Sequence, residues 1–157
     1  MINMRFNQAA AILDCPPHGS EISFKGITTD SRKIVPGMLF AALSGKTFDG
    51  HDYAGQAREL GAVALLVSRE VDADLPTLLV DDVLQALGQL AAAWRMQCPA
   101  RVVGITGSNG KTTVKEMIAS ILRLSGSVLA TSGNFNNELG LPLTLFELGH
   151  SHDYAVI

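Results

Sequence analysis

The chain has little cysteine, little charge and no long apolar run, and each shortage excludes a class of protein. Its 157 residues include two cysteines, 6% aromatic residues and 17% charged residues. Cys15 and Cys98 stand in no CxxC or Cys/His cluster, so we expect free thiols in a reducing compartment rather than disulfides or structural zinc. No apolar stretch approaches the roughly 18 residues of a membrane span, and residues 1–6 lack a signal-peptide core. We therefore expect a cytoplasmic protein without a membrane span.

The overall composition indicates a folded protein that does not bind nucleic acid. Twelve Lys and Arg residues face 15 Asp and Glu residues, for a formal net charge of −3, which is unlike a basic nucleic-acid binder. Apolar residues make up 47% of the chain, which is typical of globular proteins. This length is enough for one domain, or two small ones, with a real core. Nothing in the composition indicates an oligomeric state.

The first part of the chain alternates short helices with short strands. Helical spacing and turn residues predict helices over 6–13 and 52–60, the second ending at Gly61. Residues 22–27 can form a short strand, and buried strands are predicted at 38–43, a compact apolar run, and at 62–67 and 77–80. Residues 1–80 are thus expected to form a small α/β domain.

The second part repeats the alternation around a longer helix. Asp81 is the predicted N-cap of a helix that runs to about Gln97, with one apolar face made of Val83, Leu87, Leu90, Ala91 and Trp94. Strands are predicted at 101–106, 127–131 and 154–157, and helices at 114–122 and 141–148, with Pro142 in the first turn of the last helix. Strands alternating with helices favour parallel sheets. Residues 81–157 would begin a second α/β domain, and the few strands and the apolar end of the chain make us expect a fragment.

A glycine-rich segment between a predicted strand and a predicted helix indicates a phosphate loop. It reads GITGSNGKTT over residues 104–113. Glycines let successive backbone N–H groups approach phosphate oxygens, and a helix N-terminus adds donors and partial positive charge. Lys111 would reach the β- and γ-phosphates, Thr112 would bind Mg²⁺, and Thr113 would bond a phosphate oxygen nearer the nucleoside. The predicted ATP contacts are Gly107, Ser108, Asn109, Gly110, Lys111, Thr112 and Thr113, with Lys111 also catalytic.

The spacing of this loop departs from the common pattern. GxxxxGK[ST] requires glycine at position 105, where this chain has Ile105, and its glycines are at 104, 107 and 110. Without further evidence, the segment could also be a helix-capping loop that binds no nucleotide. Both interpretations therefore stay open on the loop alone.

The unusual spacing resembles the ATP loop of the Mur ligases and of the related folylpolyglutamate synthases, in the residues Gly107–Thr113. Three other segments are similar to the UDP-sugar-binding N-terminal domain of the Mur ligases, namely Thr29–Arg32, Pro36–Gly45 and Asp49–His51. The synthases lack that domain. The resemblance therefore favours the Mur ligases and implies a UDP-sugar domain followed by the start of a parallel-sheet ATPase domain.

Within the Mur ligases, Thr131–Thr144 is similar to the branch that adds D-alanyl-D-alanine, as are Val114–Met117 and Asp153–Ile157. The tripeptide-forming branch usually carries a Thr-Thr-Pro segment, which is absent here. The resemblance implies an ATP- and Mg²⁺-dependent ligase of peptidoglycan precursor synthesis, which joins D-alanyl-D-alanine to UDP-N-acetylmuramoyl-tripeptide through an acyl phosphate. It covers the N-terminal third of such an enzyme, so we expect this chain to be inactive by itself. The alternatives are a non-catalytic nucleotide-binding module and the tripeptide-forming branch.

Several polar residues have both a functional and a structural interpretation. The resemblance implies that Ser31 binds the UDP-sugar and Arg32 its diphosphate, whereas an Asx-turn with a solvated arginine is the alternative. The amides of Asn134, Asn136 and Asn137 could bind the sugar-nucleotide or form a polar loop. His51 could lie near the UDP pocket or cap the following helix. His150 and His152 have no evident third ligand for a metal.

Overall fold

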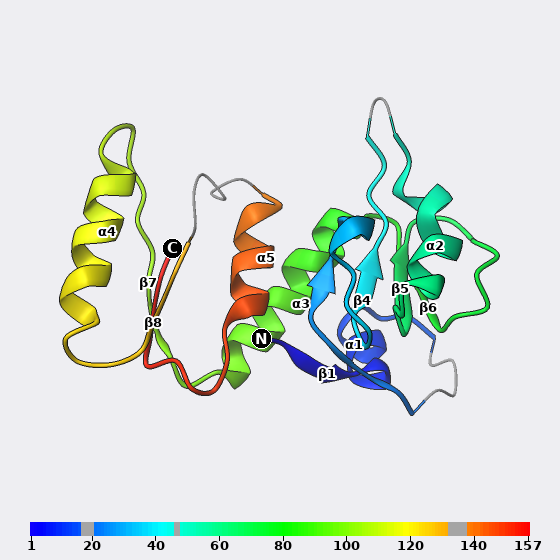
Figure 1. Ribbon diagram of the computed structural model, residues 1–157, viewed down its shortest axis with the longest axis horizontal. Coiled ribbons are helices and arrows are strands. Elements are labelled where there is room, and N and C mark those ends of the chain that lie inside the picture. Colours follow the sequence, from blue (N-terminus) through cyan, green and yellow to red (C-terminus); the bar gives the residue numbers. More distant parts are fainter. Residues whose placement is uncertain (17–20, 46–47, 132–137) are drawn as a thin grey trace. The chain divides into compact units, whose positions relative to one another are not determined.

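The computed structural model describes residues 1–16, 21–45, 48–131 and 138–157 (Figure 1). It divides into two compact units, Met1–Leu90 and Ala91–Ile157, and their boundary falls inside helix α3 (Val83–Gln97). Both units combine helices with a parallel sheet, which confirms the predicted α/β class. Among the helices in the described part of the chain, none has the length and apolar character needed to cross a bilayer.

Unit 1 is built around a four-stranded parallel sheet. The strands are β3 (Ile27–Thr28), β4 (Leu39–Ala41), β5 (Ala64–Val67) and β6 (Thr77–Leu79), and each pairs with the next in chain order. Every residue of β5 is buried, as expected of an apolar run in the middle of a parallel sheet. Side chains of β4 and β5 form a core cluster with Ala54 and Ala57 of helix α2 (Ala54–Glu59).

A small antiparallel pair stands beside this sheet and was not predicted. It joins β1 (Asn3–Arg5) to β2 (Ser23–Lys25), and α1 (Phe6–Ile12) follows β1 directly. The prediction of one strand over 22–27 was wrong, because Gly26 has a φ of +86° and bends the chain there. Residues before Gly26 pair with β1, and residues after it enter the parallel sheet.

Aspartate side chains cap two short 3₁₀ turns of unit 1, and a glycine ends helix α2. Two 3₁₀ turns, η1 (Ser31–Lys33) and η2 (Gly50–Tyr53), follow Asp30 and Asp49, and each carboxylate accepts a backbone N–H of its turn. The helix predicted over 52–60 is therefore divided between η2 and α2. Gly61 ends α2 with a φ of +95°, as predicted.

Helix α3 has the predicted buried face but a different N-cap. The carboxylate of Asp82, rather than Asp81, accepts the backbone N–H of Gln85 at 3.0 Å. This spacing is the usual one, because an N-cap side chain reaches the third residue after it. The predicted apolar face is at most 4% exposed at each of its positions, which are Val83, Leu87, Leu90, Ala91 and Trp94.

Unit 2 has a three-stranded parallel sheet in the order β7-β9-β8. The strands are β7 (Arg101–Val103), β8 (Val128–Ala130) and β9 (Tyr154–Val156). Figure 1 shows α4 (Lys111–Leu122) running alongside the strands, and it contacts β8 and β9. Pro142 lies in the first turn of α5 (Gly140–Glu147), as predicted. The indole N–H of Trp94 donates to the Leu148 carbonyl at 2.9 Å, which fixes the end of α3 within this unit.

Candidate functional site

The glycine-rich loop of unit 2 joins the end of β7 to the first residue of α4. Gly107 and Gly110 have φ angles of +151° and +77°, which other residues rarely adopt. Residues 106–110 are exposed, and a Cβ added at Gly104 or Gly110 would meet no atom within 4 Å. The loop is therefore shaped by backbone conformation, with open space around it for a ligand.

Two backbone hydrogen bonds fix the base of this loop to the sheet. The N–H of Ile105 donates to the Ile157 carbonyl at 2.7 Å, and the N–H of Ile157 donates to the Val103 carbonyl at 2.9 Å. The loop thus follows the carboxyl end of β7 beside the carboxyl end of β9. Ligands of open parallel sheets bind at this edge.

Lys111 lies over the loop at the start of α4. Its Nζ donates to the Gly107 carbonyl at 2.5 Å, so the ammonium group is held against the loop backbone. Thr112 and Thr113 follow in the first turn and are exposed. A lysine ammonium, two hydroxyls and the N-terminus of a 12-residue helix together suit a phosphate group.

A second lysine of α4 is buried close to the same edge of the sheet. Lys115 is 7% exposed and donates to the carbonyl of Thr131, the residue that follows β8. Its Nζ also lies 3.3 Å from a carboxylate oxygen of Glu116. Sequence reasoning missed this residue, although its place four positions after Lys111 puts both lysines on one face of the helix.

Unit 1 contains a pocket of about 520 Å³ that is lined by residues from all three sequence segments Thr29–Arg32, Pro36–Gly45 and Asp49–His51. Its polar lining comes largely from the motif that contains Ser31 and Arg32, and its apolar lining includes three aromatic rings that sequence reasoning missed. Such a combination suits a ligand with a flat ring and polar substituents. The lining residues are Thr29, Asp30, Ser31, Arg32, Phe40, Phe48, Gly50, Tyr53 and Gln56.

Arg32 forms a local ion pair at the rim of this pocket. Its Nε and Nη2 each lie 2.9 Å from an oxygen of Asp30, and its backbone N–H donates to the same carboxylate at 3.1 Å. The Arg32 side-chain bonds lower the pKa of Asp30 to about 2. The Asx-turn alternative is therefore present in the structure, on residues that also line the pocket.

His51 does not line the pocket, and it does not cap α2 with its side chain. Its ring is buried, one nitrogen facing Asp49 and the other facing Ser68, the residue after β5. The capping group of η2 is the Asp49 carboxylate, which accepts the His51 backbone N–H at 3.0 Å. His51 therefore connects the turn to the sheet.

The remaining residues considered from the sequence are the three asparagines, two histidines and two cysteines, and none of those that the structure describes is seen in either site. Asn134, Asn136 and Asn137 fall outside the described residues. Within the described ranges, no group of three or more His, Cys, Asp or Glu side chains could hold a metal ion. His150 packs edge-on against Trp94, and His152 accepts the Gly149 N–H at 3.0 Å. Both cysteines are free thiols.

Two family models match the chain in the regions that carry these two sites. Residues 23–95 match the model described as "Mur ligase family, catalytic domain", and residues 105–157 match "Mur ligase middle domain". The first match contains the pocket of unit 1, and the second contains the glycine-rich loop from Ile105 onward.

Curated relatives match over the whole chain. The sequence is 53% identical over 157 residues to the UDP-N-acetylmuramoyl-tripeptide–D-alanyl-D-alanine ligase of Escherichia coli (strain K12). This match covers 100% of this chain and 35% of that protein. The ligase of the same name from Haemophilus influenzae is 47% identical over 163 residues, covering 100% of this chain and 36% of the relative. The chain thus spans about a third of the length of these relatives.

Solved structures give the same result for the fold. A crystal structure of MurF from Acinetobacter baumannii superposes with a TM-score of 0.89 at 39% identity, over 100% of this chain and 36% of that one. The MurF ligase from Thermotoga maritima in complex with ADP superposes with a TM-score of 0.77 at 35% identity, over 84% and 31% of the two chains.

Proposed function

Because the chain belongs to the Mur ligase family, we propose that it is the N-terminal part of an ATP-dependent ligase that joins D-alanyl-D-alanine to UDP-N-acetylmuramoyl-tripeptide. In this proposal residues 1–80 bind the UDP-sugar, and residues 81–157 begin the ATP-binding domain. The enzyme would act in peptidoglycan precursor synthesis in the cytoplasm. The remaining two-thirds of such a ligase would receive the D-alanyl-D-alanine.

The observation that carries the proposal is the presence of two different ligand sites in one chain. Unit 1 has a pocket with aromatic and polar walls, and unit 2 has an exposed glycine loop with a lysine at a helix N-terminus. A simple nucleotide-binding module would need only the second. A ligase that activates a UDP-sugar precursor with ATP needs both.

The pocket of unit 1 supplies contacts for the UDP-sugar. Ser31 offers a hydroxyl that can donate to or accept from the uracil or ribose. The aromatic walls offer a surface for the base, and Arg32 would bond the diphosphate with donors beyond those it directs at Asp30. Asn134, Asn136 and Asn137 are also proposed to contact the sugar-nucleotide.

The loop of unit 2 supplies contacts for ATP. Backbone N–H groups of Gly107, Ser108, Asn109 and Gly110 would bond the phosphate oxygens, as nests of this kind do. The Lys111 ammonium would exchange the Gly107 carbonyl for the β- and γ-phosphates, and Thr113 would bond a phosphate nearer the nucleoside. The structure of a similar ligase in complex with ADP supports the proposal that a protein of this fold binds an adenine nucleotide.

The described residues fit one protein ligand of a Mg²⁺ ion. Thr112 is exposed in the first turn of α4, directly after Lys111, so its hydroxyl lies beside the proposed phosphate site. Mg²⁺ in phosphate sites takes few protein oxygens and completes its shell with phosphates and waters. When bound there, Mg²⁺ would withdraw charge from the phosphate oxygens and so make ADP a better leaving group.

The proposed reaction has two steps. A carboxylate oxygen of the tripeptide attacks the γ-phosphorus, and the bond from that phosphorus to the bridging oxygen breaks, giving an acyl phosphate and ADP. The amine of D-alanyl-D-alanine then attacks the acyl carbon and loses a proton as phosphate departs. Lys111 offsets charge on the transferred phosphoryl group.

The test is to titrate the chain separately with UDP-N-acetylmuramoyl-tripeptide and with Mg-ATP in a calorimeter. We expect each ligand to bind in the absence of the other. If the chain bound Mg-ATP but not UDP-N-acetylmuramoyl-tripeptide, the result would instead support a nucleotide-binding module. With both ligands and D-alanyl-D-alanine present, we expect no steady phosphate release, because an unpositioned amine forfeits about 7–11 kcal/mol of barrier lowering.

A further inference from the structure

The buried His51 has no part in either proposed ligand contact, yet its ring bonds two other residues of unit 1, Asp49 and Ser68. We propose that His51 is a positioning residue for the pocket of unit 1, which bonds the turn η2 to the end of β5 and thereby fixes the pocket wall formed by Gly50 and Tyr53. The ligand named in the test rests on the proposed function. The geometry of the wall is independent of it.

The ring of His51 has one defined arrangement of donors and acceptors. It is 4% exposed, and its Nε2 lies 2.9 Å from the backbone nitrogen of Ser68. A backbone N–H can only donate, so Nε2 accepts and the proton of the neutral ring is on Nδ1. That nitrogen lies 2.5 Å from an oxygen of Asp49, to which it donates.

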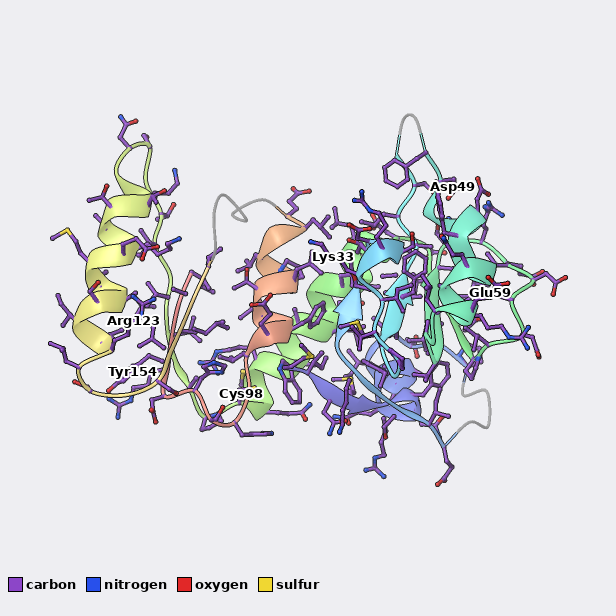
Figure 2. All side chains as sticks on the ribbon, viewed as in Figure 1. Lys33, Asp49, Glu59, Cys98, Arg123 and Tyr154 are labelled. Carbon is purple, nitrogen blue, oxygen red and sulfur yellow. The ribbon has the colours of Figure 1, made fainter. Side chains whose placement is uncertain are left out.

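Asp49 is the other fixed point of this arrangement. The carboxylate oxygen that faces the ring also accepts the His51 backbone N–H and the Ser44 hydroxyl, both at 3.0 Å. The other oxygen lies 3.1 Å from Nη2 of Arg69, which also bonds Asp52. These bonds, those from His51 first, hold the pKa of Asp49 well below its usual range. The carboxylate therefore stays ionised and holds the ring in one orientation (Figure 2 labels Asp49).

Gly50, between Asp49 and His51, packs tightly against the chain that follows β4, which restricts the position of turn η2. Gly50 donates its N–H to the Leu43 carbonyl at 2.8 Å, and a Cβ added to it would lie 2.7 Å from the backbone N and O of Leu43. The backbone of η2 is thus pressed against the segment after β4 and tied through His51 to the residue after β5. Gly50 and Tyr53 line the pocket from this turn, so His51 sets the position of that wall without touching a ligand.

The chemistry of the position also shows which replacement should work. Leucine would fill most of the volume but would leave the Ser68 N–H and the Asp49 carboxylate without their bonds to the ring. Glutamine carries one acceptor and one donor on a neutral amide, so it can serve both partners. Leucine and glutamine at position 51 therefore separate bonding from simple space filling.

The experiment compares His51→Leu, His51→Gln and the control Ser68→Ala, which keeps the backbone N–H that bonds Nε2. Each 157-residue chain is titrated with UDP-N-acetylmuramoyl-tripeptide and with Mg-ATP. We expect affinity for the UDP-sugar to fall about tenfold in His51→Leu, and to stay within about threefold of the unaltered chain in the other two. ATP affinity should stay unchanged in all three. The proposal would be overturned if His51→Leu bound the UDP-sugar as tightly as the unaltered chain does. It would also be overturned if His51→Leu and His51→Gln lost the same amount of affinity for the UDP-sugar.

A second measurement needs no ligand. Amide hydrogen exchange of Gly50 and Ser68 should be faster in His51→Leu and restored in His51→Gln, and nitrogen NMR should find the proton of His51 on Nδ1. Unchanged exchange in His51→Leu would contradict the inference even if the UDP-sugar binds. Failure of the unaltered chain to bind the UDP-sugar would instead count against the proposed function, and exchange would then decide the inference alone.

Discussion

The two candidate sites are held in shape in different ways. The pocket of unit 1 is bordered by turns whose side chains bond one another, through Asp30 with Arg32 and Asp49 with His51. The loop of unit 2 is shaped by positive φ angles at Gly107 and Gly110 and by one bond from Lys111. One site depends on packed, mutually bonded side chains, and the other on backbone conformation and charge.

The difference corresponds to what each proposed ligand offers. A phosphate group carries charge and several equivalent oxygens, so exposed N–H groups and one ammonium suffice to bind it. A base and a sugar are nearly neutral and are recognised by shape and by a few placed polar groups. Unit 1 should therefore be sensitive to changes in packing, and unit 2 to changes in charge.

The largest effect should come from packing in unit 1. Gly50→Ala would put a methyl group against the backbone of Leu43, and we expect a loss of about 3 kcal/mol in the free energy of unfolding of unit 1. Gly55→Ala is the matched control in α2, because its Cβ would meet no atom within 4 Å and alanine favours a helix. Urea unfolding measures both, and similar stability of the two variants would contradict a tightly packed turn.

Removal of charge in unit 2 should weaken ATP and leave the fold intact. Lys111→Ala should lower the affinity for Mg-ATP by about 2 kcal/mol, roughly 30-fold, because a charge-assisted phosphate contact is lost. The melting temperature should hardly change, since the side chain lies at the start of α4 over an exposed loop and is not part of the core. Arg123→Ala, at the other end of α4, is the control and should bind ATP normally (Figure 2 labels Arg123). Unchanged ATP affinity in Lys111→Ala would refute the phosphate loop.

A smaller effect should separate the two ligands. Ser31→Ala removes one neutral hydroxyl from the pocket, so UDP-N-acetylmuramoyl-tripeptide should bind about 1 kcal/mol more weakly while ATP affinity stays the same. Calorimetry of both ligands with this variant checks the split. Undiminished UDP-sugar affinity would leave the Asx-turn as the function of the motif.

The smallest effect concerns acid. The pKa of Asp30 is lowered to about 2, from an ordinary value of about 3.9, so its pair with Arg32 stabilises the turn above pH 4. This stabilisation should be lost progressively as the pH falls from about 4 toward 2. The Nε–H resonance of Arg32 in NMR of the folded chain should move with a midpoint near pH 2, the lowered pKa of Asp30, and it should not move in Asp30→Asn. Movement centred near pH 4 would show that the pair leaves the carboxyl unperturbed.

The sequence predicts elements whose signals are local. The glycine-rich loop before α4, the buried face of α3, Gly61 and Pro142 all lie where spacing and residue type indicate. By contrast, β1 has three residues, too few for a periodic pattern, and it forms only because β2 pairs with it. Gly26 divides segment 22–27 between two strands through its φ angle, which residue type alone does not reveal.

The sites are harder to predict, because their walls come from distant segments. Ser31 and Arg32 could be proposed from their motif, but Phe40, Phe48 and Tyr53 reach the same pocket from other elements. The apolar positions that predict α4 include Met117 and Ile121, which are 60% and 64% exposed, while Lys115 is buried. Helical spacing identifies the helix, but only tertiary contacts decide which of its faces is covered.

The strand order of unit 2 has a consequence for how the chain would emerge from a ribosome. In unit 1 each strand of the parallel sheet pairs with its predecessor in the chain, so that sheet can grow as synthesis proceeds. In the part of unit 2 that the structure describes, β7 and β8 each pair with β9, which lies between them. Neither strand has its sheet partner until Tyr154–Val156 has been made, and these contacts span many residues. The phosphate loop, whose base is bonded to Ile157, can therefore take its final form only after unit 1 has had time to fold.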